Sequence, residues 1–201
     1  MDLTIYKALN GLAFHNVWLE DPFRFAANQA QFMFVAVLAA LFFARGKWRS
    51  VHGRRGVAAA GFSALIALAI GHMIGDLWDR ARPYDAHPGV AHLFVAASHD
   101  PSFPSDHATA AFALAVAIFL YHRRAGWLML AMAATVSVSR VLVGVHYPSD
   151  VLAGALLGSL SAGLVYLVQP LNRRVEALAD RVAGLYERAA AWALRLLPYS
   201  T

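Results

Sequence analysis

The feature that most constrains the fold of this chain is a set of long stretches without a single charged residue. Five of them occur, covering residues 25 to 44, 57 to 75, 108 to 121, 125 to 139 and 151 to 172. A helix that crosses a hydrocarbon layer of roughly 30 Å needs about 20 mostly apolar residues. The first, second and fifth stretches reach that length alone, and the other two reach it only if polar residues around 106 to 107 and 140 to 146 lie at membrane depth. The sequence therefore predicts an all-α, polytopic membrane helix bundle.

Composition excludes several other classes. Only 14% of the 201 residues are charged, against roughly 25% in a soluble domain, and the mean hydropathy is +0.51. The absence of cysteine rules out a disulfide scaffold, a thiolate metal site and a cysteine nucleophile. The net charge of +5 fits a membrane topology signal better than nucleic-acid binding, so no nucleic-acid partner is expected.

The positions of arginine and lysine orient the bundle. If five spans alternate in direction, twelve cations share one face, which the positive-inside rule makes cytoplasmic. The loop 76 to 107 and the turn 140 to 150 then face outward. The twelve are Arg45, Lys47, Arg49, Arg54, Arg55, Arg123, Arg124, Arg173, Arg174, Arg181, Arg188 and Arg195.

The N-terminal segment is less apolar than the five stretches. Residues 3 to 19 have helical character but carry Lys7, Asn10, His15 and Asn16. We therefore predict that residues 1 to 24 form an interfacial or re-entrant helix on the outer face of a membrane domain covering residues 1 to 172. A sixth span is the alternative, so five or six spans are expected. The segment contains no short apolar core followed by a small-residue cleavage site, so an uncleaved start is expected.

The C-terminal segment, residues 173 to 201, has an amphipathic pattern. Its arginines recur every seven residues beside an apolar stripe, which is typical of a helix lying on an anionic cytoplasmic leaflet. A short coiled coil between two protomers, and hence a homodimer, is the alternative. The stripe consists of Val175, Leu178, Val182, Leu185, Ala189, Trp192 and Leu196.

Three segments place reactive side chains at the outer ends of the expected spans. The first, residues 75 to 84, carries Arg80 and Arg82 on the same side of an extended stretch, and Pro83 biases Arg82 away from helical geometry. Paired guanidiniums suit phosphate oxygens, although an Arg-Pro pair beside a span is also a common topological anchor.

The second segment, residues 102 to 109, opens the third span. Ser105 or Asp106 makes a good N-cap, and the unsatisfied amides of the helix start form an anion site. His107 stands in the first turn. It is either a plain polar flank or a donor of a proton to a leaving oxygen.

The third segment, residues 139 to 150, ends the fourth span and begins the fifth. Arg140 lies so deep that its head must reach outward or meet a buried anion. Gly144 and Pro148 break the helix around His146, and Asp150 is placed to accept from one ring nitrogen and raise the basicity of the other. Together with the other two segments, this pattern indicates a reaction centre at one membrane face.

These motifs resemble those of the type 2 phosphatidic acid phosphatase superfamily. That superfamily has a Lys, six residues and Arg-Pro; then Pro-Ser-Gly-His; then Ser-Arg, five residues, His, three residues and Asp. The matching positions here are Arg82-Pro83, the tetrapeptide 104 to 107, and Ser139-Arg140 with His146 and Asp150. The Lys slot is Gly75 and the Gly slot is Asp106, and Arg80 is expected to replace the missing lysine.

At both departures the chain resembles the bacterial undecaprenyl-diphosphatase branch of the bacitracin-resistance type. That branch often reads Arg-x-Arg-Pro-Phe and Phe-Pro-Ser-Asp-His-Ala-Thr, and this chain has Arg-Ala-Arg-Pro-Tyr at 80 to 84 and the full second motif at 103 to 109. The likeness covers about residues 1 to 170. The arginine-rich tail lies outside it.

The resemblance implies a mechanism and a set of roles. His146 attacks the terminal phosphorus to form a phosphohistidine, Asp150 holds its other ring nitrogen, and His107 protonates the departing lipid phosphate and later helps to activate water. Fixed cations and helix starts supply the positive charge that phosphoryl transfer needs. The phosphate ligands are expected to be Arg82, Arg140, Ser105 and Arg80.

The resemblance also implies a substrate and a location. The expected substrate is a polyprenyl diphosphate in the bacterial plasma membrane, with the active site on the extracytoplasmic face and membrane lipids as the other partners. No cofactor or metal is expected, because no further cluster has metal-ligand spacing. A phosphatidylglycerol-phosphate or phosphatidate phosphatase is the alternative within the superfamily. A non-enzymatic transporter is a more remote alternative, because no convincing internal repeat is present.

Overall fold

The computed structural model describes residues 1–43 and 51–196. The predicted cytoplasmic cations Arg45, Lys47 and Arg49 lie outside these residues. The described chain is helical and contains no strand. In order, its elements are α1 (Asp2–Phe14), α2 (Val17–Phe43), α3 (Val51–Trp78), α4 (Pro83–Ala86), α5 (Asp106–Tyr121), α6 (Arg123–Leu142), α7 (Pro148–Leu167) and α8 (Gln169–Leu196).

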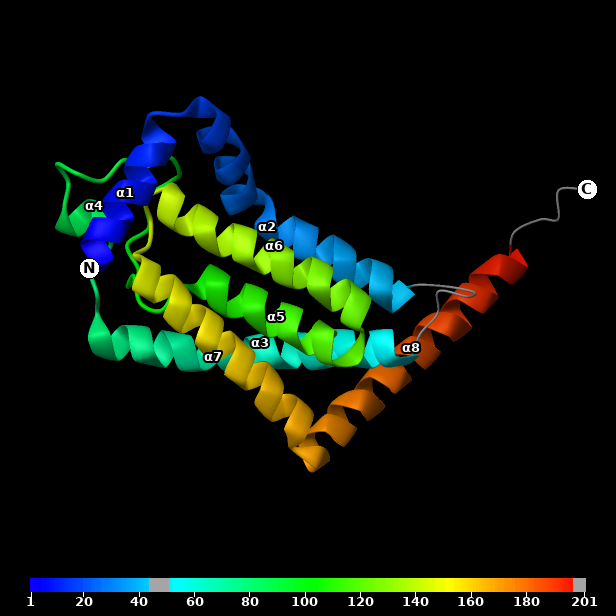
Figure 1. Cartoon of the computed structure of the whole chain (residues 1–201). Coiled ribbons are helices and arrows are strands. Elements are labelled where there is room, and N and C mark those ends of the chain that lie inside the picture. The colour runs from blue at the N-terminus through cyan, green and yellow to red at the C-terminus, as the bar shows by residue number, and fades with distance from the viewer. Residues whose placement is uncertain (44–50, 197–201) are drawn as a thin grey trace, which may run out of the picture.

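Helix α5 is the centre of the bundle, and α3, α6 and α7 pack around it (Figure 1). Five of the alanines along α5 are almost fully buried, which lets the neighbouring helices approach closely. Four other helices, α2, α3, α6 and α7, are long and apolar enough to cross a membrane within the described chain, and α5 is a shorter apolar helix of 16 residues. The expected all-α polytopic bundle is confirmed. The buried alanines are Ala108, Ala111, Ala113, Ala115 and Ala117.

Two glycines of α7 determine how closely it approaches α5. A Cβ on Gly154 would lie 2.6 Å from the carbonyl oxygen of Ser105, and one on Gly158 would lie 2.2 Å from that of Thr109. A larger residue at either position would push the helices apart. The approach also brings the start of α5 to the start of α7, where the amide of Ser105 donates to the carbonyl of Asp150 at 3.0 Å.

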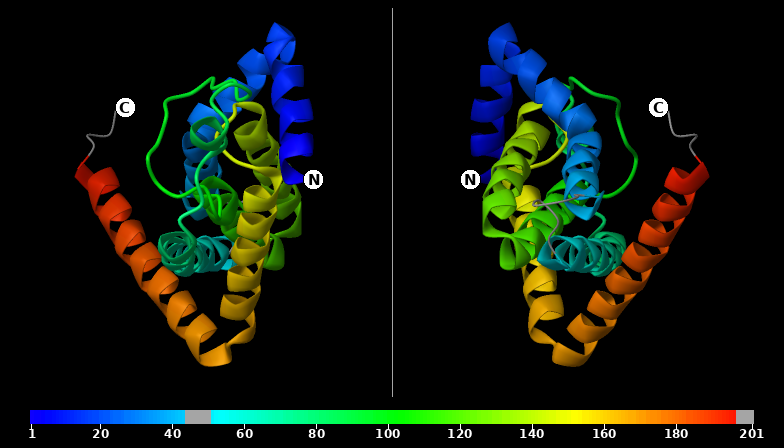
Figure 2. Two further views of the ribbon diagram at one scale, coloured as in Figure 1. Left: turned by 90° about the vertical axis from the view of Figure 1, so that its left-hand side faces the viewer. Right: turned by 90° about the vertical axis from the view of Figure 1, so that its right-hand side faces the viewer.

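Helix α1 lies across the end of the bundle that α6 and α7 form (Figure 2). The predicted helix at 3 to 19 is in fact divided, because α1 ends at Phe14 and α2 begins at Val17. With 13 residues, α1 is only about 20 Å long, too short to be a sixth span. Asn10 fixes it by donating to the carbonyls of His92 (2.8 Å) and Leu142 (2.9 Å).

Helix α8 lies at the opposite end of the bundle and packs on α3 (Figure 1). Its contact face is acidic, since Arg54 pairs with Glu187 at 2.6 Å and Arg55 pairs with Glu176 at 3.1 Å and Asp180 at 2.9 Å. The described members of the predicted apolar stripe that are large, Leu178, Val182, Leu185 and Trp192, are exposed. The side chains of Val175, Arg195 and Leu196 lie outside the described part.

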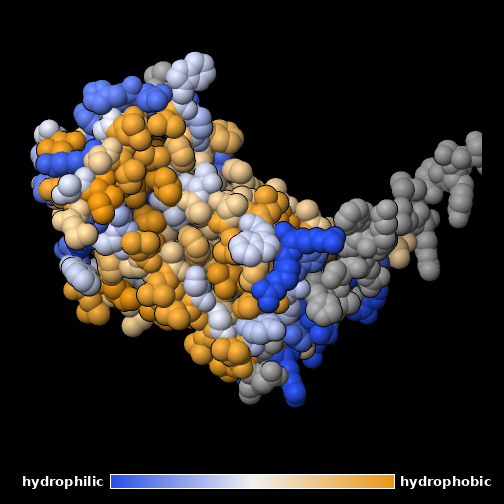
Figure 3. Space-filling view, in the orientation of Figure 1, coloured by the Kyte–Doolittle hydropathy of each residue, from blue (hydrophilic) through white to orange (hydrophobic). Residues whose placement is uncertain are grey.

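The surface divides along the length of the bundle. Figure 3 shows apolar residues over its middle and hydrophilic residues gathered toward the two ends. This distribution is expected of a helix bundle whose sides face lipid tails and whose ends face water.

Candidate active site

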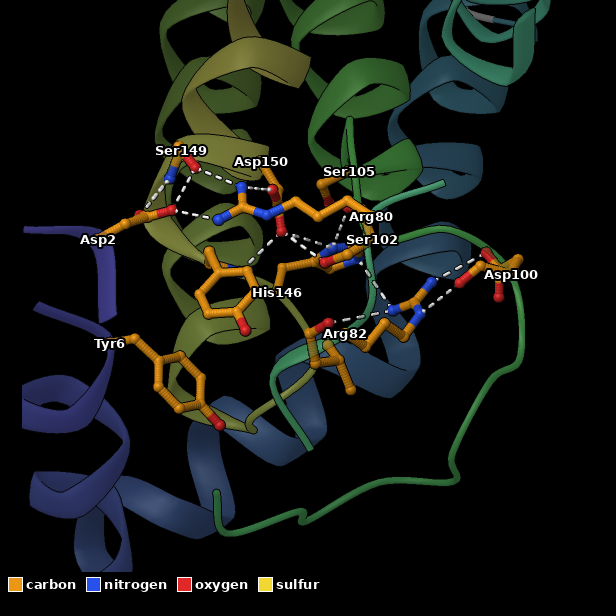
Figure 4. Close-up of polar contacts among 12 residues, drawn as sticks. Asp2, Tyr6, Arg80, Arg82, Asp100, Ser102, Ser105, His146, Ser149 and Asp150 are labelled. Carbon is orange, nitrogen blue, oxygen red and sulfur yellow. Dashed lines mark hydrogen bonds and ion pairs between the residues drawn. The ribbon is translucent and has the colours of Figure 1, made fainter. Parts of the chain in front are cut away.

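The three segments singled out in the sequence meet at the end of the bundle that α1 covers (Figure 4). Arg82 follows α3, Ser105 and His107 lie at the start of α5, and Arg140, His146 and Asp150 flank the turn between α6 and α7. All of them are buried except His107, which is partly exposed. The fold thus brings together side chains from α5, α6, α7 and two connecting segments.

The turn that carries His146 depends on Gly144. This residue has a φ of +91°, a conformation that glycine adopts without steric cost, and a Cβ there would lie 2.3 Å from the carbonyl oxygen of His92. The amide of His146 then donates back to the carbonyl of Arg140 at 3.3 Å. The turn points the imidazole into the protein, where it is only 2% exposed.

The hydrogen bonds of His146 determine its tautomer. Its Nδ1 lies 2.9 Å from the carbonyl oxygen of Ser102 and 3.7 Å from Oδ2 of Asp150. Because a carbonyl oxygen only accepts, we assign the proton to Nδ1. The lone pair is therefore on Nε2, which lies 3.4 Å from Nη1 of Arg82. This differs in detail from the sequence expectation, because the Ser102 carbonyl makes the closer contact with Nδ1.

Asp150 is a completely buried carboxylate with several donors. Oδ2 accepts from the Ser102 hydroxyl at 2.6 Å and from the Tyr147 amide at 2.8 Å, and Oδ1 accepts from Arg80 at 2.5 Å. A buried charge is tolerated only when it is paired and hydrogen-bonded in this way. Asp150 therefore fixes the loop segment of Ser102 on one side and the start of α7 on the other.

The site also contains donors that are not used by the protein. Oγ of Ser105 and Nε of Arg140 are buried and make no hydrogen bond to the described part of the chain. Arg82 is held by its bonds to the carbonyl of Val145 at 3.2 Å and to the carboxylate of Asp100 at 2.9 Å. Buried donors without a partner are rare in folded proteins, and here they suit the oxygens of a phosphate.

Burial lowers the pKa of His146 below its ordinary value. Asp150 opposes this change, whereas the charges of Arg82 and Arg140 add to it. The neutral imidazole is therefore favoured, as a nucleophilic nitrogen requires.

Arg80 differs from the other predicted phosphate ligands. Its guanidinium donates to Asp2 at 2.7 Å, to Ser149 at 2.7 Å and to Asp150 at 2.5 Å, and it lies 4.1 Å from the ring centroid of Tyr147. These contacts direct it toward carboxylates on the α1 side of His146 (Figure 4). Asp2, Ser102 and Asp100 were not predicted as site residues, since none belongs to a recognised motif position.

An apolar groove of about 360 Å³ leads away from His107 between α2, α3, α5 and α6. Its walls include Phe34, Leu38, Leu68 and Leu114, and Asp106 lies at its polar end. There Asp106 pairs with His72, whose Nε2 is 3.4 Å from its carboxylate. This partner accounts for the aspartate at a position where the superfamily motif has glycine.

The described residues contain no group of three or more His, Asp or Glu side chains that could hold a metal ion. Metal independence stays a prediction, which activity in the presence of EDTA would test.

Histidines and arginines gathered at the end of a membrane helix bundle form the arrangement expected of an integral-membrane phosphatase. The model of the PAP2 superfamily matches residues 56–174, and the chain belongs to this superfamily. It is 30% identical over 187 residues to "Undecaprenyl-diphosphatase BcrC" of Bacillus subtilis, covering 93% of this chain and 92% of the relative. It is 28% identical to "Putative undecaprenyl-diphosphatase YbjG" of Escherichia coli, covering 96% and 90%.

Two solved structures have the same fold. The first, a PAP2-type phosphatidylglycerolphosphate phosphatase from Bacillus subtilis, superimposes with a TM-score of 0.57 at 23% identity, covering 82% of this chain and 84% of that chain. The second, LpxE of Aquifex aeolicus, has a TM-score of 0.60 at 21% identity, covering 81% and 93%. They confirm a polytopic membrane bundle of the PAP2 type.

Proposed function

We propose that this membrane phosphatase hydrolyses a polyprenyl diphosphate, undecaprenyl diphosphate in particular, to the monophosphate and inorganic phosphate. In a bacterium this reaction recycles the lipid carrier of cell-wall synthesis, and it underlies resistance to bacitracin. The names of the relatives from Bacillus subtilis and Escherichia coli support the substrate. The active site is proposed to face the outside of the plasma membrane.

The groove beside His107 is the observation that carries this proposal. Its wall is mostly apolar apart from Gln31, and His72, Asp106 and His107 line it near the start of α5. An isoprenoid chain buries only apolar surface, which stabilises its binding in such a groove. A lipid bound there would place its first phosphate beside His107 and its terminal phosphate nearer His146.

The first half of the proposed reaction is phosphoryl transfer to the enzyme. Nε2 of His146 forms a bond to the terminal phosphorus, and the bond from that phosphorus to the bridging oxygen breaks. His107, protonated, gives its proton to the departing lipid monophosphate. Arg82, Arg140 and Ser105 hold the equatorial oxygens, on which negative charge is concentrated in the transition state.

The second half is hydrolysis of the phosphohistidine. His107, now neutral, accepts a proton from a water molecule as the water oxygen attacks phosphorus. The bond between phosphorus and Nε2 breaks, inorganic phosphate leaves, and His146 returns to its starting form. Asp150 and the carbonyl of Ser102 stabilise the charged imidazole during the cycle.

The test is phosphate release by the purified protein from three lipids: undecaprenyl diphosphate, phosphatidylglycerol phosphate and phosphatidate. We expect the diphosphate to have the highest kcat/KM. The variant His146→Ala should lose turnover and covalent phosphate labelling by at least about 1,000-fold. A wide preference for either glycerolipid would overturn the substrate, and labelling that persists in the variant would overturn the nucleophile.

A further inference from the structure

We propose that Asp2 and Arg80 form a brace that positions Asp150 and, through it, His146, so that α1 supports catalysis. This inference rests on the proposed role of His146 as nucleophile. It assigns Arg80 a positioning role in place of the phosphate contact expected from the sequence. It also assigns a role to Asp2, which belongs to no motif.

The guanidinium of Arg80 is fully occupied by contacts within the protein. Nη1 donates to Oδ1 of Asp150 and to the Ser149 hydroxyl, and Nη2 donates to Oδ2 of Asp2. The face of the guanidinium lies over the ring of Tyr147. With two carboxylates, a hydroxyl and an aromatic ring around it, the group is already satisfied. A phosphate would have to compete with Asp150 for the same nitrogen atoms.

The carboxylate of Asp2 is held by hydrogen bonds from Ser149 and Arg80. Its carboxylate accepts from the amide of Ser149 at 3.0 Å and from the hydroxyl of the same residue, in addition to Arg80. Burial alone would raise its pKa, but the hydrogen bonds from Ser149 and Arg80 hold the pKa of Asp2 below its ordinary value. Asp2 is therefore ionised at neutral pH and fixes the free side of the guanidinium.

Two further hydrogen bonds fix the position of α1 beside His146. The Tyr6 hydroxyl donates to the carbonyl of Gly144 at 3.3 Å, and Asn10 donates to that of Leu142. Leu142 is the last residue of α6, and Gly144 lies in the turn that leads from it to His146. Helix α1 thus contacts the nucleophile's turn with its middle and the start of α7 with its first residue. The two sets of contacts fix His146 and Asp150 relative to each other.

The charge of Arg80 has a chemical consequence that differs from support alone. A cation on Oδ1 weakens the attraction of Asp150 for a proton on His146. The other charged or titratable groups that act on His146 are Arg82, Arg140, His107 and Asp106. Removal of the Arg80 charge should therefore raise the pKa of His146. The acid limb of the kcat/KM profile should then move to higher pH.

The test compares Asp2→Asn, Arg80→Gln and Arg80→Lys with a control on the same helix, Lys7→Gln, which removes a charge from an exposed position. We expect kcat to fall by about 10-fold in Asp2→Asn and by about 10- to 100-fold in Arg80→Gln, with KM within about two-fold of wild type. The acid limb should move up in Arg80→Gln and return toward wild type in Arg80→Lys. Lys7→Gln should match wild type.

A double variant tests whether the two residues act as a unit. Asp2→Asn combined with Arg80→Gln should be no slower than Arg80→Gln alone, because Asp2 acts through the guanidinium. Asp2 is 28% exposed in its side chain, so its conservative variant should fold even if Arg80→Gln does not. Additive losses would overturn the brace.

A phosphate contact by Arg80 would give a different result. Arg80→Gln would then raise KM and weaken inhibition by inorganic phosphate, with an unchanged acid limb, and Asp2→Asn would leave kcat unaffected. That outcome would overturn the proposal. The comparison is made on whichever lipid the wild type turns over, so a wrong substrate is recognised separately. A wrong nucleophile is recognised by an active His146→Ala.

Discussion

At the scale of single residues, His146 combines two features that favour attack by Nε2. The carbonyl of Ser102 holds the proton on Nδ1, and burial lowers the pKa of the imidazole. The reactive form of His146 is the neutral one. Activity should therefore persist as the pH falls below about 6.5, the ordinary pKa of histidine. It should be lost only when the pH falls through the lowered pKa of His146. The measurement is the kcat/KM profile, corrected for substrate ionisation by phosphorus NMR. A corrected acid limb above about pH 6.5 would contradict it.

Part of this site could be predicted from the sequence. The spacing of His146 and Asp150, together with Arg82, Arg140 and the segment around Ser105, predicted which side chains would meet. The acceptor for Nδ1 could not be predicted, because a backbone carbonyl has no sequence signature. Asp2 was equally hidden, since its partner Ser149 is 147 positions away. Only the fold brings them together.

At the scale of helices, the lengths of the apolar stretches and the positions of the charged residues predicted the bundle well. They predicted the ends of the helices less well. The five uncharged stretches lie in α2, α3, α5, α6 and α7. Helix α5 begins at Asp106 but has only 16 residues, and α6 includes Arg140 but ends at Leu142, before His146. The break between α1 and α2 was missed because residues 15 and 16 carry no Pro or Gly signal. The acidic face of α8 was overlooked because the arginine repeat and the apolar stripe dominated its pattern.

The contact between α5 and α7 gives a prediction at this scale. In Gly158→Ala the new Cβ would lie 2.2 Å from a backbone oxygen and 2.8 Å from the amide nitrogen of Ala113, so the helices must separate. We expect thermal unfolding in detergent to show a loss of about 1 to 3 kcal/mol, and activity to fall because Ser105 moves relative to Asp150. Gly163→Ala is the matched control, since no atom lies within 4 Å of its Cβ. Equal behaviour of the two variants would show that the close approach is unimportant.

At the scale of the whole molecule, the two ends have different chemistry. The site and α1 lie at one end, and Arg54, Arg55 and α8 lie at the other. Under the positive-inside rule the second end faces the cytoplasm, which places the reaction on the outside. A diphosphate headgroup too polar to cross the hydrocarbon layer would then be processed on the face where it is exposed. The orientation stays a prediction, and it can be tested directly.

The chain contains no cysteine, so single cysteines report their side of the membrane without background. Gly89 lies in the exposed loop at the site end and Gly184 lies on α8, and a Cβ at either position meets no atom within 4 Å. In intact cells a membrane-impermeant maleimide should label Gly89→Cys and should label Gly184→Cys only after permeabilisation. Labelling in denaturant gives the control for equal amounts of protein. The reverse pattern would place the site in the cytoplasm and would require the lipid to be dephosphorylated on the inner leaflet.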